Sequence, residues 1–114
     1  MKSIPTVNLK SDRPTVQEAL NRLERELSSA RQRGIAILKI IHGYGSTGAG
    51  GDIRIAVQLR LKELAETGSV RGCVFGEEWS KANEGVWSLL QVHPEWKGDS
   101  DLGRRNMGIT VVLL

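Results

Sequence analysis

Short runs of consecutive hydrophobic residues alternate along the chain with stretches in which hydrophobic residues recur at helical spacing. The runs have the length of β-strands and the repeats are typical of amphipathic helices. They predict strands at residues 4–9, 35–41, 70–75 and 109–114, and helices beginning near Thr15 and covering residues 52–66 and 83–92. Without the third helix the order is β-α-β-α-β-β, which favours an α/β fold with a mixed sheet and right-handed crossovers.

The run at residues 35–41 is aliphatic except for Lys39, and this predicts a central strand that is buried on both faces. The helix that precedes it has a clear start, because Thr15 and Glu18 have the spacing of a capping box. Gly34 is a suitable residue to end that helix.

The helix at residues 52–66 has a second hydrophobic side, formed by Ile55 and Leu59, which something must cover. The long connection at residues 76–107 holds all three tryptophans, Trp79, Trp87 and Trp96. We expect this insertion to be a packed excursion whose tryptophans form a small core over Ile55 and Leu59. A partner subunit is the other candidate cover, and base stacking is the other role for the tryptophans.

A chain of 114 residues with 39% hydrophobic content predicts one domain over residues 1–114, with the insertion inside it. The single Cys73 excludes an internal disulfide and is expected to be a buried structural thiol in a reducing compartment. No apolar run has the length of a membrane span or a leader, so we expect a cytoplasmic protein without a membrane partner. No Cys/His cluster has zinc-ligand spacing, and we expect neither metal nor cofactor.

Positive charge is concentrated before the insertion. Residues 1–75 hold twelve Lys and Arg against seven Asp and Glu, a net charge of +5, whereas residues 76–114 hold four against six, a net charge of −2. This division is compatible with a polyanionic partner. In the acidic part, Asp99 and Asp101 are candidate cation ligands but more typical helix or turn caps, and Arg104 and Arg105 are candidate contacts to a nucleic-acid backbone.

A glycine-rich segment follows the central strand and precedes the second helix. After His42 it contains Gly43, Gly45, Gly48, Gly50 and Gly51. Backbone N–H groups in such a loop, together with the helix N-terminus, make an anion site. A nucleotide cofactor is disfavoured, since the acidic residue expected about 20 positions on falls at Glu63 inside a helix, and the P-loop Lys-Ser/Thr pair is missing.

His42 lies at the carboxyl end of the central strand, where α/β folds place their ligands. It can donate to a phosphate, act as a general acid or base in strand cleavage, or hydrogen-bond the loop and shape it. The residues alone leave these roles open.

Residues 40–45, Ile-Ile-His-Gly-Tyr-Gly, resemble the H-G-x-G signature of the Smr (small MutS-related) domain family, and residues 108–113 resemble its closing G-x-T-x-V-x-L strand. The resemblance covers nearly the whole chain apart from residues 76–107. It implies a two-layer α/β sandwich similar to the C-terminal domain of translation initiation factor three. It also implies a protein that binds or nicks nucleic acid, and some members of the family act on RNA at ribosomes.

One departure from the family concerns the L-D-x-H motif at the end of the first strand, where Asn8 replaces the aspartate and Lys10 the histidine. Asparagine cannot act as a base or carry the carboxylate charge. Lysine, with an unperturbed pKa near ~10.4, is a poor proton acceptor at neutral pH but a good phosphate contact. The departure therefore favours a nucleic-acid binder over a nuclease.

The prediction is binding of a nucleic-acid backbone, with RNA preferred slightly over DNA because the domain stands alone, and with the ribosome as a candidate place of action. The residues expected to line the site are Lys10, His42, Gly43, Tyr44, Gly45 and Arg54. One alternative is an Smr-type endonuclease that uses His42 as its catalytic residue. The other is a protein-interaction or homodimer module that uses the insertion at residues 76–107.

Overall fold

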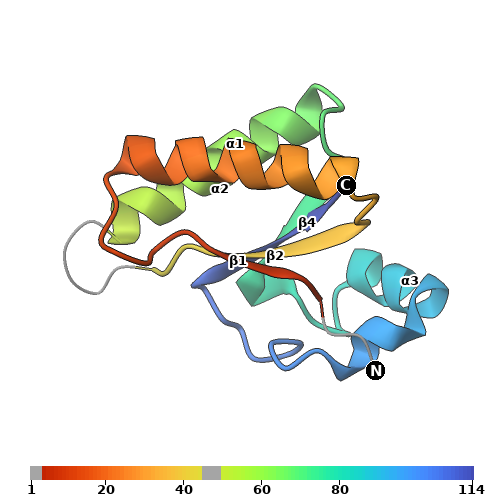
Figure 1. Cartoon of the computed structure of the whole chain (residues 1–114). Helices are drawn as coiled ribbons and strands as arrows, with labels where there is room; N and C mark the ends of the chain where they lie inside the picture. Colours follow the sequence, from red (N-terminus) through yellow and green to blue (C-terminus); the bar gives the residue numbers. More distant parts are fainter. Residues whose placement is uncertain (1–3, 45–49) are drawn as a thin grey trace.

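Four strands form one mixed sheet in the computed structural model, which describes residues 4–44 and 50–114. They are β1 (Thr6–Asn8), β2 (Ile37–Ile41), β3 (Gly72–Phe75) and β4 (Ile109–Leu113), and the sheet order is β1-β2-β4-β3 (Figure 1). β1 is parallel to β2, and β4 is antiparallel to both β2 and β3. The predicted element order and mixed sheet are confirmed.

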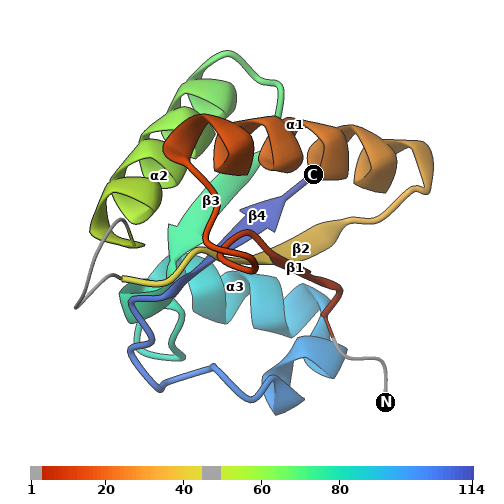
Figure 2. The same ribbon diagram turned by 60° about the vertical axis from the view of Figure 1, so that its left-hand side comes forward.

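Two long helices, α1 (Val16–Gln32) and α2 (Gly50–Glu66), lie together over one face of the sheet (Figures 1 and 2). α1 begins as predicted, because the Thr15 side chain accepts from the Glu18 N–H and the Glu18 carboxylate accepts from the Thr15 N–H. Its end is also as predicted, since Gly34 has the left-handed φ of +70° that glycine adopts without strain.

The main core lies between these helices and the sheet. β2 contributes Leu38 and Ile40 to it, and the inward side of α2 contributes Ile53, Val57 and Leu61. The alternate residues of β2 point to the opposite face, where Ile37 is also buried. The central strand is therefore buried on both faces, as its aliphatic run predicted.

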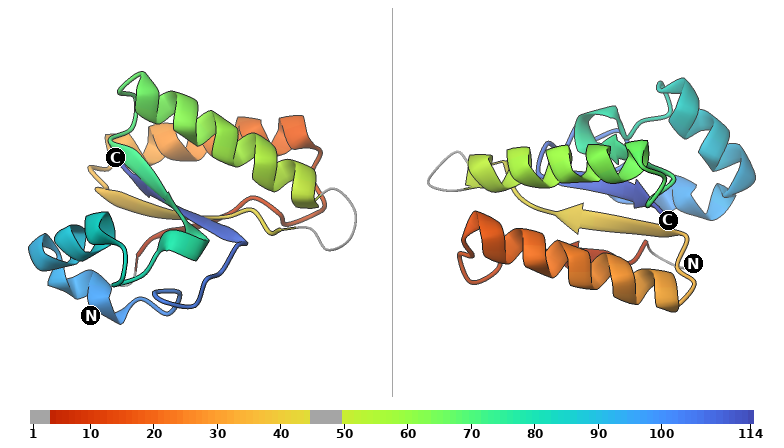
Figure 3. Two further views of the ribbon diagram at one scale, coloured as in Figure 1. Left: turned by 180° about the vertical axis from the view of Figure 1, so that it is seen from behind. Right: turned by 90° about the horizontal axis from the view of Figure 1, so that it is seen from above.

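The insertion covers the second face of the sheet. It consists of a 3-10 turn η1 (Gly76–Glu78), the helix α3 (Glu84–Val92) and a second 3-10 turn η2 (Pro94–Gly98), all on the side opposite α1 and α2 (Figure 3). A second core lies beneath it, formed by Ile4, Ile37, Trp79, Val86, Leu90, Trp96, Ile109 and Val111. The sandwich of sheet and two helices thus gains a further layer from the insertion.

The prediction that the insertion covers Ile55 and Leu59 is wrong. Their side chains on α2 are 66% and 57% exposed. The insertion packs instead on the far face of the sheet, because residues such as Ile109 and Val111 would otherwise leave a larger apolar surface in water. The prediction of a tryptophan core holds for Trp79 and Trp96, whereas Trp87 is 46% exposed.

A buried ion-pair network ties the insertion to β2. The ammonium of Lys39 lies 2.7 Å from the Asp99 Oδ1 and 2.7 Å from the Asp101 Oδ2. The other oxygen of Asp99 accepts from the indole N–H of Trp79 at 3.0 Å. Burial alone would lower the pKa of Lys39, but the hydrogen bonds that its ammonium donates to the two carboxylates outweigh this effect and raise the pKa. The two aspartates therefore serve as counter-ions of Lys39.

Cys73 is half-buried in β3 and packs against the main core, and its burial raises the pKa of the thiol. This agrees in part with the buried structural thiol that was expected. Within residues 4–44 and 50–114, every helix is too short or too polar to span a bilayer.

Candidate nucleic-acid interface

The candidate site lies where the parallel strands β1 and β2 end side by side. Asn8 is in register with Ile41, and the N–H of Leu9 donates to the Ile41 carbonyl at 2.8 Å. The segments that leave the two strands, at Lys10 and His42, are therefore neighbours. This is the edge of the sheet at which α/β folds place ligands.

His42 is fully buried, and both of its ring nitrogens have partners. Nδ1 lies 2.6 Å from the Gly43 carbonyl oxygen, which can only accept, so Nδ1 carries the proton. Nε2 of the neutral ring then accepts from the hydroxyl of Thr110 at 2.9 Å. That hydroxyl in turn accepts from the side-chain amide of Gln58 at 3.2 Å. A single directed chain of hydrogen bonds thus joins α2, β4 and the start of the glycine-rich segment.

The charge state of His42 agrees with this chain. Burial lowers the pKa of the imidazole, and the nearby Arg54 charge lowers it further, against an opposing effect of the hydrogen bond to Gly43. A neutral ring at pH 7 is the form in which Nε2 can accept from Thr110. In this geometry the His42 ring is bonded to the backbone at Gly43. Whether it also transfers a proton stays a prediction.

Two glycines let the segment at residues 42–44 lie close to the residue that precedes β4. The N–H groups of His42 and Gly43 both donate to the Gly108 carbonyl at 3.0 Å, and Gly43 has a φ of +73°. A Cβ on Gly108 would lie 3.3 Å from the Tyr44 ring and 3.5 Å from the Gly43 Cα. Glycine at position 108 therefore leaves room for the Tyr44 side chain, which remains 55% exposed.

Lys10 lies against Gly43. Its side chain is exposed, yet a Cβ on Gly43 would come 3.4 Å from the Lys10 Cδ. The backbone of Lys10 is fixed by Asn8, whose side-chain oxygen accepts the Lys10 N–H at 2.9 Å. Arg22 on α1 donates to the Asn8 carbonyl at 3.4 Å and adds a second cation at this edge. The structure therefore brings Lys10 and the start of the glycine-rich segment together.

Arg54 on α2 is near enough to lower the pKa of His42, but its guanidinium is paired. It donates to the Glu77 carboxylate of η1 at 3.0 Å, and this pair is partly exposed. The Arg54 Nε is buried and makes no hydrogen bond to a described residue. Arg54 therefore joins α2 to the start of the insertion through its pair with Glu77.

Gly45 falls outside the described residues. Arg104 and Arg105 are exposed, and Arg105 has a φ of +54°. Within the described ranges no cluster of three or more His, Cys, Asp or Glu side chains could hold a metal ion.

Three residues of the site were missed by sequence reasoning: Gln58, Glu77 and Thr110. Thr110 carried a signal, since it is the threonine of the closing G-x-T-x-V-x-L pattern. Gln58 is a buried polar residue on the inward side of α2, so its sequence position alone could have raised the question of its partner.

Comparison with known proteins gives one family and one solved structure. The Smr domain family model matches residues 12–114. The crystal structure of the Smr domain of Thermus thermophilus MutS2 superposes with a TM-score of 0.60 at 23% sequence identity, covering 97% of this chain and 98% of that one. This likeness concerns the fold. A comparison with curated protein sequences finds no match.

Proposed function

Because this chain belongs to the Smr domain family, we propose that it binds the phosphodiester backbone of RNA or DNA at the carboxyl ends of β1 and β2. The family is generally nucleic-acid binding or endonuclease-like. The observation that carries the proposal is the position of Lys10, whose exposed side chain lies against Gly43 at the start of the glycine-rich segment.

Each part of this edge suits a phosphate group. Lys10 supplies an ammonium charge on a flexible side chain. Gly43 has no side chain that would keep a nucleic-acid strand away from its backbone. The exposed ring of Tyr44 can contact a sugar or a base, or donate its hydroxyl to a phosphate oxygen. Arg54 can bind a phosphate with its planar fork once Glu77 releases it.

The arrangement favours binding without cleavage. A general acid or base must come within hydrogen-bond reach of the reacting atoms, but both ring nitrogens of His42 are engaged in a buried chain. The Asn8 side chain is occupied by the backbone of Lys10. We therefore propose a binder in which His42 orders the loop. The slight preference for RNA that the sequence suggested is part of the same proposal.

The test is a native gel with a labelled stem-loop RNA and a labelled branched DNA, each with and without Mg²⁺. We expect Lys10→Gln to weaken binding several-fold on both probes and to reduce the dependence of log K on log salt by about one. Lys62→Gln is the matched control, since Lys62 is exposed near the other end of α2 and should change neither quantity.

If both substitutions weaken binding equally, only the overall charge matters, and the proposed site is wrong. The same samples on a denaturing gel report cleavage. Intact label is expected. Shortened label that is lost in His42→Ala would instead establish the endonuclease alternative, and tighter binding of the DNA probe would overturn the preference for RNA.

A second prediction concerns Glu77, which competes with phosphate for Arg54. We expect Glu77→Gln to strengthen binding several-fold, because an amide releases the guanidinium more easily than a carboxylate does. The neighbouring Glu78→Gln makes the same change in net charge next to the pair. Because Glu78 is exposed and is not bonded to Arg54, it should give a much smaller increase.

Titration of the stem-loop RNA with both variants measures the difference. If Glu78→Gln strengthens binding as much as Glu77→Gln, the gain comes from net charge and Arg54 is not a phosphate ligand. An Arg54→Lys change in the Glu77→Gln background should abolish the gain, because lysine lacks the planar fork.

A further inference from the structure

Trp87 is the one tryptophan of the insertion that the core does not use. Trp79 and Trp96 are 0% and 8% exposed, whereas Trp87 is 46% exposed on the outer side of α3. The inward side of that helix is filled by Val86 and Leu90. An exposed indole on a rigid helix is a stacking surface, and its hydrophobic area is not needed for the packing beneath it.

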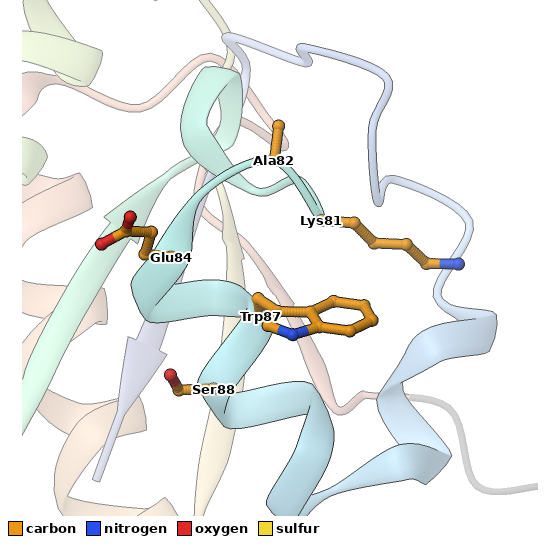
Figure 4. A pocket seen from close by; sticks show the side chains of 5 residues that line it. All are labelled: Lys81, Ala82, Glu84, Trp87 and Ser88. Atoms are coloured by element: carbon orange, nitrogen blue, oxygen red, sulfur yellow. The ribbon is translucent and has the colours of Figure 1, made fainter.

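The indole forms one wall of a surface hollow of about 540 Å³, lined by Lys81, Ala82, Glu84, Trp87 and Ser88. Figure 4 shows the Trp87 ring and the Lys81 side chain extending from the ribbon on the same side, with Glu84 on the other side. Lys81 also lines a second hollow of about 290 Å³, together with Lys97. The two hollows therefore adjoin.

Two lysines lie on the side of the second hollow, which Asp99 also lines with a carboxylate that is paired with Lys39. The Lys97 ammonium, on η2, lies 5.8 Å from the centroid of the Trp87 ring, a cation–π distance. Lys81 comes from the segment before α3, so the two cations reach the ring from different parts of the insertion. Glu84 repels phosphate, which leaves the lysine side as the path for a polyanion.

We propose that Trp87, Lys81 and Lys97 form a second nucleic-acid contact that takes an unpaired base of a strand, with the ring stacked on Trp87 and the adjacent phosphates on the two lysines. An aromatic face flanked by cations is the arrangement by which proteins bind single strands without sequence preference. For its class of ligand this inference rests on the proposed function. It concerns another surface, because α3 covers the far face of the sheet, away from the carboxyl end of β2 (Figure 1).

The experiment uses a labelled single-stranded oligomer of about eight nucleotides, within the usual site size for such surfaces. Binding is followed by fluorescence anisotropy of the label and by quenching of the intrinsic tryptophan emission. We expect Trp87→Ala to weaken binding about tenfold and Trp87→Phe to weaken it less, since phenylalanine still stacks. Both variants should lose the quenching, because Trp79 and Trp96 are shielded from the ligand.

An abasic oligomer with the same phosphates is the matched ligand. The native protein should bind it about tenfold more weakly than the oligomer with bases, and Trp87→Ala should bind both alike. Equal binding of the two oligomers by the native protein would overturn the proposal, and so would quenching that survives in Trp87→Phe. A nucleoside monophosphate that displaces the oligomer at the same concentration as the oligomer itself would also overturn it in favour of a free nucleotide.

Different experimental results would contradict the two proposed contacts. Trp87→Ala should leave binding to a fully paired duplex unchanged, because its bases are already stacked. Lys10→Gln should weaken duplex binding whatever happens at Trp87. If Lys10→Gln changes no affinity while Trp87→Ala loses the single strand, the sheet-edge site is wrong and the stacking site stands; the reverse pattern overturns the stacking site alone.

Discussion

Replacing Lys39 with methionine is expected to lower the free energy of unfolding by about 3–5 kcal/mol, the usual effect of removing one partner from a buried ion pair. Methionine fills much of the same volume, but the carboxylates of Asp99 and Asp101 remain, and the Asp99 side chain is only 6% exposed. Stability is lost because the negative charge of these two carboxylates is left without a counter-ion. Urea unfolding followed by circular dichroism measures the change.

The control removes the charges that Lys39 neutralises. Lys39→Met combined with Asp99→Asn and Asp101→Asn should recover much of the lost stability, since amides cost less to bury than unpaired carboxylates. A loss below about 1 kcal/mol for Lys39→Met alone, typical of a surface ion pair, would show that this network is not a buried one.

Gly76→Ala is expected to destabilise the protein by about 3 kcal/mol, at the upper end for an overpacked site. A Cβ on Gly76 would overlap the Asn106 carbonyl oxygen and come within 2.8 Å of both the carbonyl oxygen and the Cγ1 of Ile109. The two oxygens belong to the backbone and cannot turn aside as a flexible side chain can. Gly76 is the residue at which the chain leaves β3 for the insertion, so the strain falls on this junction.

Gly72→Ala is the matched control at the other end of β3. A Cβ there would lie 3.9 Å from a methyl group of Leu113, an ordinary contact, so its effect should stay within about 1 kcal/mol. Thermal unfolding of both variants compares them directly. If Gly76→Ala is as mild as Gly72→Ala, Gly76 does not pack closely against Asn106 and Ile109.

The sheet and its two long helices could be predicted because their signals are local. The Thr15–Glu18 capping box and the aliphatic run of β2 each depend on a few neighbouring residues. The placement of the insertion was not predicted, although the sequence of β2 indicated that both faces of the sheet are covered. A strand buried on both faces requires a cover on each face, and α1 and α2 supply only one. A lysine within that strand likewise required a buried counter-ion.

The candidate site was predictable only where two neighbouring strands end. Parallel pairing of β1 with β2 places Lys10 beside Gly43, and both residues were expected there. The partners of His42 could not be found in this way. Thr110 reaches it from the far end of the chain, so this contact depends on the packing of β4 against β2. Likewise, no local pattern in the sequence would pair Glu77 with Arg54, because the two residues lie far apart along the chain.

The position of β4 has a consequence for how the fold is made. β4 is the last of the four strands in the sequence, yet it lies between β2 and β3 and pairs with both. During synthesis β3 has no neighbour in the sheet until β4 has emerged, and Thr110 cannot yet meet His42. Such non-local pairing also slows folding, because the chain loses entropy when distant segments come together, before their contacts contribute any stability. A nascent chain of this domain is therefore expected to stay open to proteases until its final strand leaves the exit tunnel.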